Sequence, residues 1–422
     1  MNNNNFSQKE NVLLVGVIYG ELDEEKVREH LDELSLLAET AGGHVIQRFT
    51  QKISKVNSSY FIGKGKAEEI ICIAKDLKIS SIIFDDELSP SHLKNYNNLS
   101  KEIKIIDRSM LILEIFKQHA QTKEAKTQVE LAHLQYMLPR LTRAWTHLER
   151  QMGGIGTRAG AGETQIEVDR RLIRTRISKL KKDLKKIDKE REVQSKRRDN
   201  HFKVTLVGYT NAGKSTLMKA ISGANVFIQN QLFATLDTTT RLVELDNAHS
   251  IMLSDTVGFV RKLPHHLVAS FKSTLKEVVS SDLILMVLDS SSKQVYDHYK
   301  TIINVLKDLG AEGYKTLIVL NKVDHEDVEC QTTYLNRKFP KGVFVSALNQ
   351  LRINVLSKEI INLMDDMYQV VDFEFSYKES KALAQAQEGV DVLERNYHDD
   401  HVQLKIKGSR WRINQIQSSL NK

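Results

Sequence analysis

The spacing of apolar residues in the first quarter of the chain alternates between two patterns. Short apolar runs are typical of buried strands, and apolar residues every three or four positions are typical of amphipathic helices. The predicted strands cover residues 12–18, 79–84 and 103–106, and the predicted helices cover residues 24–40 and 66–78. This alternation indicates an α/β domain with a small, largely parallel sheet, which we expect over residues 1–109.

The next region has helical periodicity on both sides of a glycine cluster. The two helical stretches, Ser109–Leu138 and Glu163–Arg198, contain no proline. In the second stretch, apolar residues recur at roughly heptad-like intervals at Ile166, Leu172, Ile173, Ile177, Leu180, Leu184 and Ile187. Such a seam favours a coiled-coil arm, so we expect two long antiparallel helices joined by a glycine-rich loop over residues 110–200.

Strands and helices alternate regularly again after Phe202. The predicted strands cover residues 204–207, 251–253, 283–288, 316–320 and 343–345. This regularity predicts a doubly wound α/β domain over residues 201–369. Strand-like runs at 373–377, 392–397 and 402–406, with a helix ending near Gly389, predict a small C-terminal α+β domain over residues 370–422.

Positive charge is concentrated in one segment of the chain. The 422 residues carry a formal net charge of +7, yet residues 170–198 hold fourteen Lys/Arg against four Asp/Glu. Such an excess favours binding to nucleic-acid phosphates, with a solvated helix face as the alternative. No apolar run is long enough to cross a membrane, no secretory signal is visible, and Cys72 and Cys330 lack metal-type spacing. We therefore expect a cytoplasmic protein, and a monomer.

A glycine-rich segment directly follows the predicted strand at 203–207 and opens a helix. It consists of Gly208, Tyr209, Thr210, Asn211, Ala212, Gly213, Lys214, Ser215 and Thr216. Glycines let backbone N–H groups wrap around phosphates, and the helix N-terminus adds its positive end. In a P-loop of this kind Lys214 reaches the β- and γ-phosphates and the Ser215 hydroxyl binds Mg²⁺.

Three further motifs follow predicted strands in the order that a GTP site requires. They are Asp255-Thr256-Val257-Gly258, Asn321-Lys322-Val323-Asp324 and Ser346-Ala347-Leu348. The Asp255 carboxylate can hold Mg²⁺ through water, and the Gly258 N–H can meet the γ-phosphate. The Asp324 carboxylate can accept hydrogen bonds from guanine N1–H and the 2-amino group, while the Ala347 N–H can reach O6. Adenine lacks both donors, and leaving Asp324 unpaired would cost about 1–3 kcal/mol, so GTP is favoured over ATP.

Two more segments complete a family pattern. One contains Phe233, Ala234, Thr235, Leu236 and Asp237 and continues through Thr238-Thr239-Thr240-Arg241; the other is the glycine cluster at 153–162, followed by Glu163 and by Glu167-Val168-Asp169-Arg170-Arg171. With the P-loop and the motif from Asp255 to Val260, they make the chain resemble the HflX family of bacterial ribosome-associated GTPases. The resemblance runs from about Val12 to at least Met367.

The resemblance implies roles for several residues. Thr235 would complete the Mg²⁺ site with Ser215 and Asp255 and would sense the γ-phosphate, which makes Lys214, Thr235 and Gly258 the catalytic candidates. The family usually has proline where this chain has Thr238, and also before the last glycine of the cluster. These departures should loosen the two loops without removing a ligand.

Phe259 stands where many GTPases place a glutamine that orients the attacking water. An apolar ring cannot do this, so intrinsic hydrolysis should be slow and should rise when a partner orders the switches. The resemblance implies that this partner is the large (50S) ribosomal subunit and its rRNA. It further implies that binding dissociates stalled or idle ribosomes or serves ribosome biogenesis.

The glycine cluster is a candidate RNA-probing loop. Five of the twenty glycines of the chain fall within residues 153–162. Glycines allow the backbone to approach RNA closely and arginines neutralise phosphates. The candidate RNA-binding residues are therefore the nearby Arg150, Arg158, Arg170 and Arg171. A flexible helix connection is the alternative.

Two other functions remain open from the residues. The chain could be a nucleotide-gated RNA-binding or remodelling factor that acts on free RNA, for which ATP could also serve. A regulatory G-protein with a protein partner is a third function, but it leaves the basic arm unused. Two measurements separate the ribosome-acting GTPase from the free-RNA factor. They are the purine preference and the response of turnover to large subunits or to naked RNA.

Overall fold

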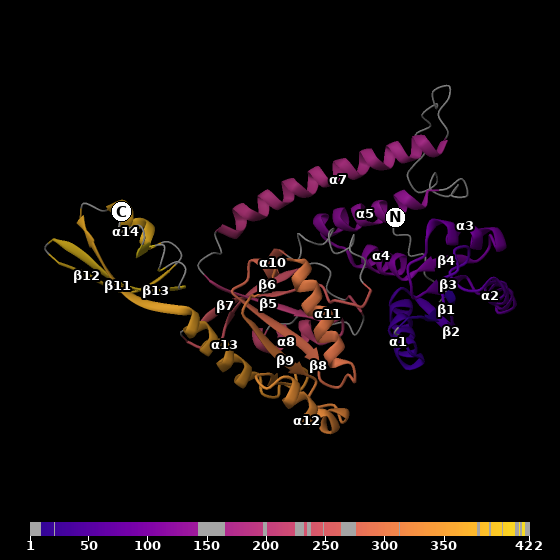
Figure 1. Cartoon of the computed structure of the whole chain (residues 1–422). Coiled ribbons are helices and arrows are strands. Elements are labelled where there is room, and N and C mark those ends of the chain that lie inside the picture. Colours follow the sequence, from indigo (N-terminus) through magenta and orange to yellow (C-terminus); the bar gives the residue numbers. More distant parts are fainter. Residues whose placement is uncertain are drawn as a thin grey trace. The chain divides into compact units, whose positions relative to one another are not determined.

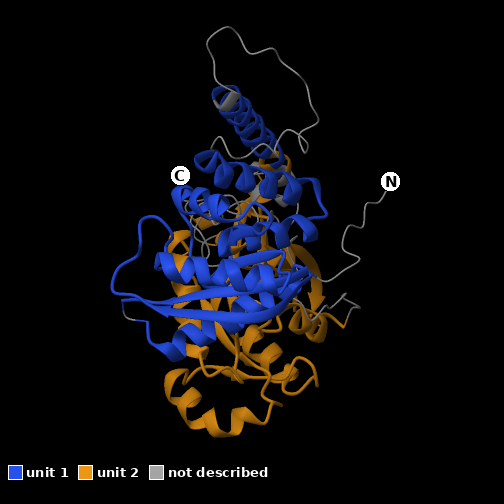
Figure 2. Cartoon of the chain, turned by 90° about the vertical axis from the view of Figure 1, so that its right-hand side faces the viewer, with its two compact units in different colours: residues 1–187, 230–237, 260–272 blue, residues 188–229, 238–259, 273–422 orange. Residues whose placement is uncertain are grey.

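The protein forms two compact units, each with its own sheet and core (Figure 2). Unit 1 comprises residues 1–187, 230–237 and 260–272, and unit 2 comprises residues 188–229, 238–259 and 273–422. The structure is a computed structural model. It describes residues 10–20, 22–141, 165–196, 201–223, 232–233, 238–247, 249–262, 276–311, 313–377, 380–387, 390–398, 400–409, 413 and 416–417.

Unit 1 is built on a four-stranded parallel sheet with the order β2-β1-β3-β4 (Figure 1). The strands are β1 (Glu10–Ile18), β2 (Gly43–Lys52), β3 (Ser81–Phe84) and β4 (Lys104–Asp107), and the helices between them are α1 (Glu24–Thr40), α2 (Lys64–Asp76) and α3 (Pro90–Leu99). All four residues of β3 are buried, as expected for a central parallel strand covered on both faces. The predicted α/β domain with a parallel sheet is confirmed.

Two elements of this sheet domain, β2 and α3, were not predicted from the apolar pattern. Strand β2 lies at the sheet edge, and nine of its ten positions are partly or fully exposed, while Phe49 is buried. An edge strand of this kind has no continuous apolar run to mark it. Helix α3 is short, and its start is set by the Ser89 capping box and by Pro90 in the first turn.

The helical region that follows contains α4 (Arg108–His119), α5 (Lys123–Met137), the 3₁₀ turn η1 (Leu138–Arg140) and α7 (Gln165–Lys196). The single helix predicted over Ser109–Leu138 is wrong. The helix ends at Ala120, which is extended, and Thr122 starts α5 by accepting a hydrogen bond from the Ala125 N–H at 3.1 Å.

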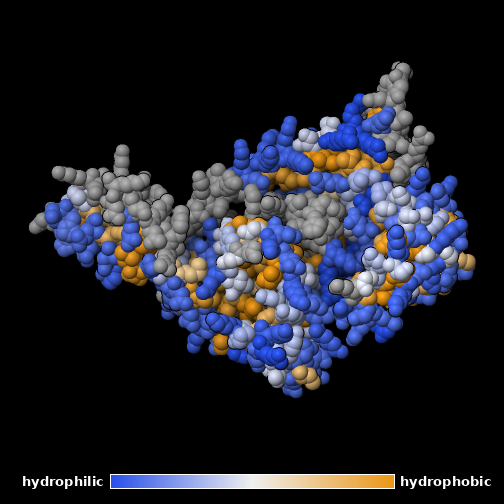
Figure 3. All heavy atoms as spheres, in the orientation of Figure 1, coloured by the Kyte–Doolittle hydropathy of each residue, from blue (hydrophilic) through white to orange (hydrophobic). Residues whose placement is uncertain are grey.

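Helix α7 packs on the α5 region through an apolar seam. The buried members of this cluster are Leu131, Leu134, Leu141, Ile173 and Leu180, and Figure 3 shows the apolar band along α7. The predicted seam is therefore largely confirmed, but Leu172 is 49% exposed and does not belong to it. Beside this seam, α7 exposes a basic row that includes Arg171, Arg174, Lys181 and Lys185.

Unit 2 contains a six-stranded sheet with the order β10-β9-β8-β5-β7-β6. The strands are β5 (Phe202–Gly208), β6 (Thr239–Glu244), β7 (Ser250–Asp255), β8 (Leu283–Asp289), β9 (Thr316–Asn321) and β10 (Val343–Phe344); the helices are α8 (Lys214–Ser222), α10 (Lys276–Val279), α11 (Val295–Asp308), α12 (Asp327–Lys338) and α13 (Ile353–Met367). Five strands are parallel and the edge strand β6, which was not predicted, is antiparallel to β7. The doubly wound domain is confirmed.

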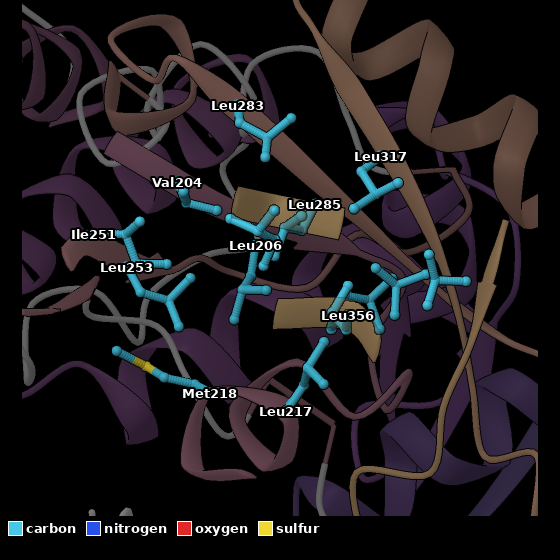
Figure 4. Close-up of a cluster of buried hydrophobic side chains, with 14 of the residues drawn as sticks. Val204, Leu206, Leu217, Met218, Ile251, Leu253, Leu283, Leu285, Leu317 and Leu356 are labelled. Carbon is cyan, nitrogen blue, oxygen red and sulfur yellow. The ribbon is translucent and has the colours of Figure 1, made fainter. Parts of the chain in front are cut away.

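The core of this sheet is formed by branched aliphatic side chains. Figure 4 shows side chains of β5, β7, β8 and β9 meeting Leu217 and Met218 of α8 and Leu356 of α13. Helices α8 and α13 therefore cover one face of the sheet. The carboxyl ends of parallel strands share one edge, and in such folds that edge is where ligands bind.

The C-terminal part of unit 2 is a small α+β structure, as predicted. Its antiparallel sheet has the order β11-β13-β12, with β11 (Tyr368–Ser376), β12 (Asp391–Tyr397), β13 (His401–Ser409) and the helix α14 (Ser380–Ala386). Phe373, Phe375, Leu404 and Ile406 form most of its core. Over the described residues, no helix is long and apolar enough to span a membrane.

Candidate functional site

The P-loop connects the end of β5 to the start of α8, as the sequence predicts. Gly213 immediately precedes the helix and has a φ of +88°, and a Cβ built on it would lie 2.3 Å from Asn321 Nδ2. Glycine is required there both by the backbone conformation and by the lack of space. The first turn of α8, which includes Thr216, begins directly after this loop. Its unpaired backbone N–H groups can therefore donate to phosphates bound in the loop.

Lys214 is held at the centre of this loop. Its Nζ donates hydrogen bonds to the main-chain carbonyls of Gly208 at 3.1 Å and Tyr209 at 2.9 Å. Burial lowers the pKa of Lys214 to about 8, and Asp255 partly opposes this. A bound phosphate would stabilise the charged ammonium, so this lysine is suited to bind polyphosphate.

Ser215 and Asp255 lie together beside Lys214. The Ser215 hydroxyl donates to Asp255 Oδ2 at 2.7 Å, and Asp255 is 2% exposed at the end of β7. A hydroxyl and a carboxylate are the hard oxygen donors that Mg²⁺ prefers. The residues therefore fit a magnesium ion that is shared with phosphate oxygens and water.

The segment after Asp255 runs parallel to the start of the P-loop and is bridged to it between Phe259 and Tyr209. The Phe259 N–H donates to Gly208 O at 3.0 Å, and the Thr210 N–H donates to Phe259 O at 2.8 Å. A Cβ on Gly258 would lie 2.8 Å from Thr210 Cα, so only glycine fits against the loop. The Phe259 ring is 2% exposed and offers no polar atom to a water molecule.

Asn321 joins the P-loop to the two loops predicted to read the base. Its Nδ2 donates to Ala212 O at 2.9 Å, and its Oδ1 accepts from the Ala347 N–H at 2.9 Å. Asn321 is 2% exposed and Ala347 is 4% exposed. The Ala347 N–H, which the sequence assigned to guanine O6, is thus engaged by Asn321 in this structure.

The carboxylate of Asp324 lies on the same side of the domain. Its Oδ2 accepts a hydrogen bond from Asn349 Nδ2 at 3.0 Å. The adjacent Lys322 has a φ of +64°, and its ammonium lies 2.7 Å from Asp289 Oδ2 at the end of β8. Leu348 is largely exposed beside them, and Val323 bonds through its N–H to Val345 O.

The sequence motifs that meet here match known proteins over most of the chain. Residues 28–117 match the family region described as GTP-binding GTPase N-terminal, residues 119–198 the GTP-binding GTPase Middle Region, and residues 203–322 the 50S ribosome-binding GTPase. The chain is 51% identical over 315 residues to the GTPase HflX of Flavobacterium psychrophilum, which covers 75% of this chain and 76% of that protein.

The chain belongs to the HflX family of GTPases. It is 41% identical over 401 residues to the GTPase HflX of Caldanaerobacter subterraneus subsp. tengcongensis, which covers 94% of this chain and 91% of that protein. Among solved structures, a GTP-binding protein of the archaeon Sulfolobus solfataricus in complex with GDP is 26% identical, with a TM-score of 0.43. That alignment covers 85% of this chain and 99% of the archaeal chain. As an HflX GTPase, the protein binds guanine nucleotide and hydrolyses GTP.

Several predicted HflX site residues lie outside the described residues. These are Ala234, Thr235, Leu236 and Asp237 of the first switch, and Arg150 and Arg158 of the arm. Phe233 is described, and its ring packs edge-to-face on Phe116 at 4.7 Å between centroids. Arg170 is exposed at the start of α7 and donates to Leu141 O at 3.4 Å, and Arg171 is exposed next to it.

Two residues that contact this site were not found from the sequence. Asp289 is a charged residue at the carboxyl end of β8. That position in a parallel sheet could have identified it as a candidate site residue. Asn349 directly follows the Ser346 motif, and its side-chain amide donates to Asp324. Its place next to a predicted base-reading loop was the signal that could have identified it.

Proposed function

We propose that the described loops bind GTP with the roles that their motifs suggest. The backbone of Gly208, Asn211 and Gly213 would surround the phosphates, and Lys214 would neutralise the β- and γ-phosphates. Asp324 would accept the two guanine donors, and the loop at Ser346 would supply an N–H to O6. The observation that supports this most strongly is the double hydrogen bond of Asn321, at 2.9 Å to both Ala212 and Ala347, because it joins phosphate and base loops into one site.

The proposal includes one Mg²⁺ ion. Ser215 would bind it directly, Asp255 through water, and Thr235 would complete its shell when the first switch closes. The ion would shield the phosphate charge, while Lys214 and the Gly258 N–H stabilise the charge that develops on the γ-phosphate. These protein groups position the nucleotide and stabilise charge, which is most of what phosphoryl transfer needs from a protein.

Hydrolysis should be slow in the isolated protein. Phe259 occupies the position of a water-orienting side chain, and its buried ring has no polar atom to offer. A partner must therefore order the attacking water or supply a polar group. This makes the protein a switch, whose turnover reports on its partner.

We propose the large (50S) ribosomal subunit as this partner. The family region over residues 203–322 is described as 50S ribosome-binding, and α7 exposes a basic row beside its apolar seam. Such a row suits rRNA phosphates. GTP would order the switches, the arm would engage rRNA in the cytoplasm, and the bound monomer would dissociate stalled or idle ribosomes or assist biogenesis.

Binding to purified subunits tests this proposal. The wild-type protein should co-sediment with 50S subunits in the presence of a non-hydrolysable GTP analogue and much less with GDP, while 30S subunits retain little. A variant with alanine at Arg158, Arg170 and Arg171 should bind nucleotide normally and lose most 50S binding. Equal binding of both proteins would remove the arm from the mechanism, and equal binding to naked RNA would favour the free-RNA factor.

A further inference from the structure

Two segments of the nucleotide-binding sequence belong to unit 1, although the strands next to them belong to unit 2. The chain passes from unit 1 to unit 2 between Asp237 and Thr238, and back between Phe259 and Val260. The two proposed γ-phosphate sensors, Thr235 and Gly258, lie within a few residues of these crossings. The contacts that these two segments make within unit 1 are therefore only a few residues away from the sensors in the sequence.

The segment after Gly258 is held in unit 1 by its side chain and by its main chain. Lys262 Nζ lies 2.5 Å from Asp85 Oδ2 and 2.6 Å from Asp86 Oδ1, in the loop after β3. One residue earlier, the Arg261 carbonyl accepts a hydrogen bond from Arg108 Nε at 3.2 Å. Lys262 also has a φ of +51°, a left-handed conformation that the surrounding contacts must stabilise.

The acidic site that receives Lys262 is buried and organised. Arg108 pairs with Asp85 at 2.7 Å and with Glu33, and the side chains of Asp85 and Arg108 are each 3% exposed. Burial alone would raise the pKa of Asp85, but Arg108 and Lys262 lower it below its ordinary value, so the carboxylate stays ionised. Arg108 thus pairs with two carboxylates, Asp85 and Glu33, and Lys262 adds a second positive charge that pairs with Asp85 and with Asp86.

The segment before Thr235 is held in unit 1 independently. Phe233 is 3% exposed, and its ring meets Phe116 of α4 edge-to-face. Aromatic pairs of this geometry are directional, so they fix the position as well as the burial of the ring. One described residue of each segment, Phe233 and Lys262, is thus held by other residues of unit 1.

We propose that Asp85 and Asp86 are positioning residues of the GTPase reaction, which act on Gly258 through Lys262. Within unit 2, Gly258 lies against Lys214, because a Cβ on Gly258 would be 3.0 Å from Lys214 Nζ. The two groups that are to meet the γ-phosphate are therefore brought together before it binds. This inference rests on the proposed role of Gly258 at the γ-phosphate.

The ion pairs of Lys262 with Asp85 and Asp86 should favour binding of GTP over GDP. Gly258 meets only the γ-phosphate, so fixing its position stabilises the triphosphate complex and leaves the diphosphate complex unchanged. Releasing Lys262 should reduce the fraction of molecules with Gly258 in place. Loss of these ion pairs should therefore lower GTP affinity and turnover, and leave GDP affinity unchanged.

Equilibrium binding of fluorescent GDP and of a non-hydrolysable fluorescent GTP analogue tests the proposal on the full chain without ribosomes. The substitution Lys262→Met keeps the aliphatic stem and removes the charge, and it should weaken analogue binding about 5- to 10-fold while GDP affinity stays within about twofold. Lys262→Arg keeps the charge and should restore most of the difference. Asp86→Asn removes one of the two carboxylates that pair with Lys262, and it should weaken analogue binding about two- to threefold.

Lys300→Met is the matched control, because Lys300 is an exposed lysine of α11 that pairs with Asp297 at 3.8 Å. It should leave both affinities unchanged. The proposal is overturned if Lys262→Met changes GDP and analogue binding equally, changes neither, or strengthens analogue binding. Because ribosomes are absent, a wild-type protein that binds both nucleotides but ignores 50S subunits would overturn the proposed partner alone.

Discussion

The side-chain amide of Asn321 donates a hydrogen bond to the carbonyl oxygen of Ala212 at 2.9 Å, and so fastens the end of β9 to the P-loop. The same side chain accepts from the Ala347 N–H through its other terminal atom. One residue thus aligns the loop that would hold phosphates with both loops that would read the base. Neither of its bonds reaches the nucleotide itself.

Replacing Asn321 with alanine should therefore disrupt the whole nucleotide site. Two buried hydrogen bonds are lost, each worth about 1–3 kcal/mol when a partner is left unpaired, so GDP affinity should fall at least about 100-fold. Fluorescent GDP titration measures this. Asn336→Ala on the exposed side of α12 is the control and should bind like the wild type. Near-normal GDP affinity of Asn321→Ala would show that the loops are aligned by other contacts.

Asp324→Asn should change which purine the protein prefers. The amide keeps the shape of the side chain but presents a donor where guanine N1–H and the 2-amino group also donate. Guanine nucleotides should bind about 100-fold or more weakly, whereas xanthine nucleotides, which carry a carbonyl at that position, should bind better. Competition of GDP, XDP and ADP against a fluorescent nucleotide gives the order. An unchanged preference for GDP would place the guanine elsewhere.

Nucleotide binding should weaken at alkaline pH because of Lys214. Burial lowers the pKa of this lysine to about 8, whereas bound phosphate favours the charged form. Above pH 8 the free protein has lost the proton that the complex holds, so binding must take up a proton and affinity falls as pH rises. Calorimetry at pH 8.5 in two buffers of different ionisation enthalpy should show uptake of a fraction of a proton. Equal heats in the two buffers would contradict this.

Unit 1 should lose stability between about pH 6.5 and pH 4 because of His30. Burial lowers the pKa of His30 to about 4, with Asp85 opposing, while the unfolded residue titrates near its ordinary pKa of 6.5. The unfolded state therefore binds more protons in this window, and stability that is complete above it is lost as pH falls. At pH 5 the loss should be on the order of 2 kcal/mol.

Hydrogen-exchange protection of β1 and α4 amides, compared at pH 7 and pH 5, measures this effect. In His30→Gln the decline should be shallower. It should not vanish, because burial also lowers the pKa of His92 and His133 in the same unit. Identical declines in the variant and the wild type would assign the pH dependence to those histidines alone.

The nucleotide site could be predicted because its chemistry is local. Lys214 and Ser215 follow their strand directly, and Asp255 and Asn321 end theirs, so the parallel sheet brings them together once the strands are recognised. The contacts that hold Lys262 could not be predicted in this way. Lys262 meets Asp86 across 176 positions, and neither residue lies in a motif.

Weak local signals explain the errors in the fold. Strand β2 was missed because an exposed edge strand needs no apolar run. The break between α4 and α5 depends on Ala120 and Thr122, and the threonine cap is a single polar residue inside a helical pattern. The apolar periodicity of α7 was clear because one side of a long helix is buried, but periodicity alone could not show that Leu172 faces outward.

We propose that this GTPase turns over slowly until it binds the 50S subunit, and a titration of GTP turnover with purified subunits tests this proposal. The measurement is inorganic phosphate released per protein molecule at saturating GTP, with 30S subunits and naked rRNA in parallel. We predict slow release by the protein alone, a rise of at least about tenfold that saturates with 50S subunits, and no comparable rise in the parallel reactions. Fast turnover by the protein alone that 50S subunits leave unchanged would contradict the account.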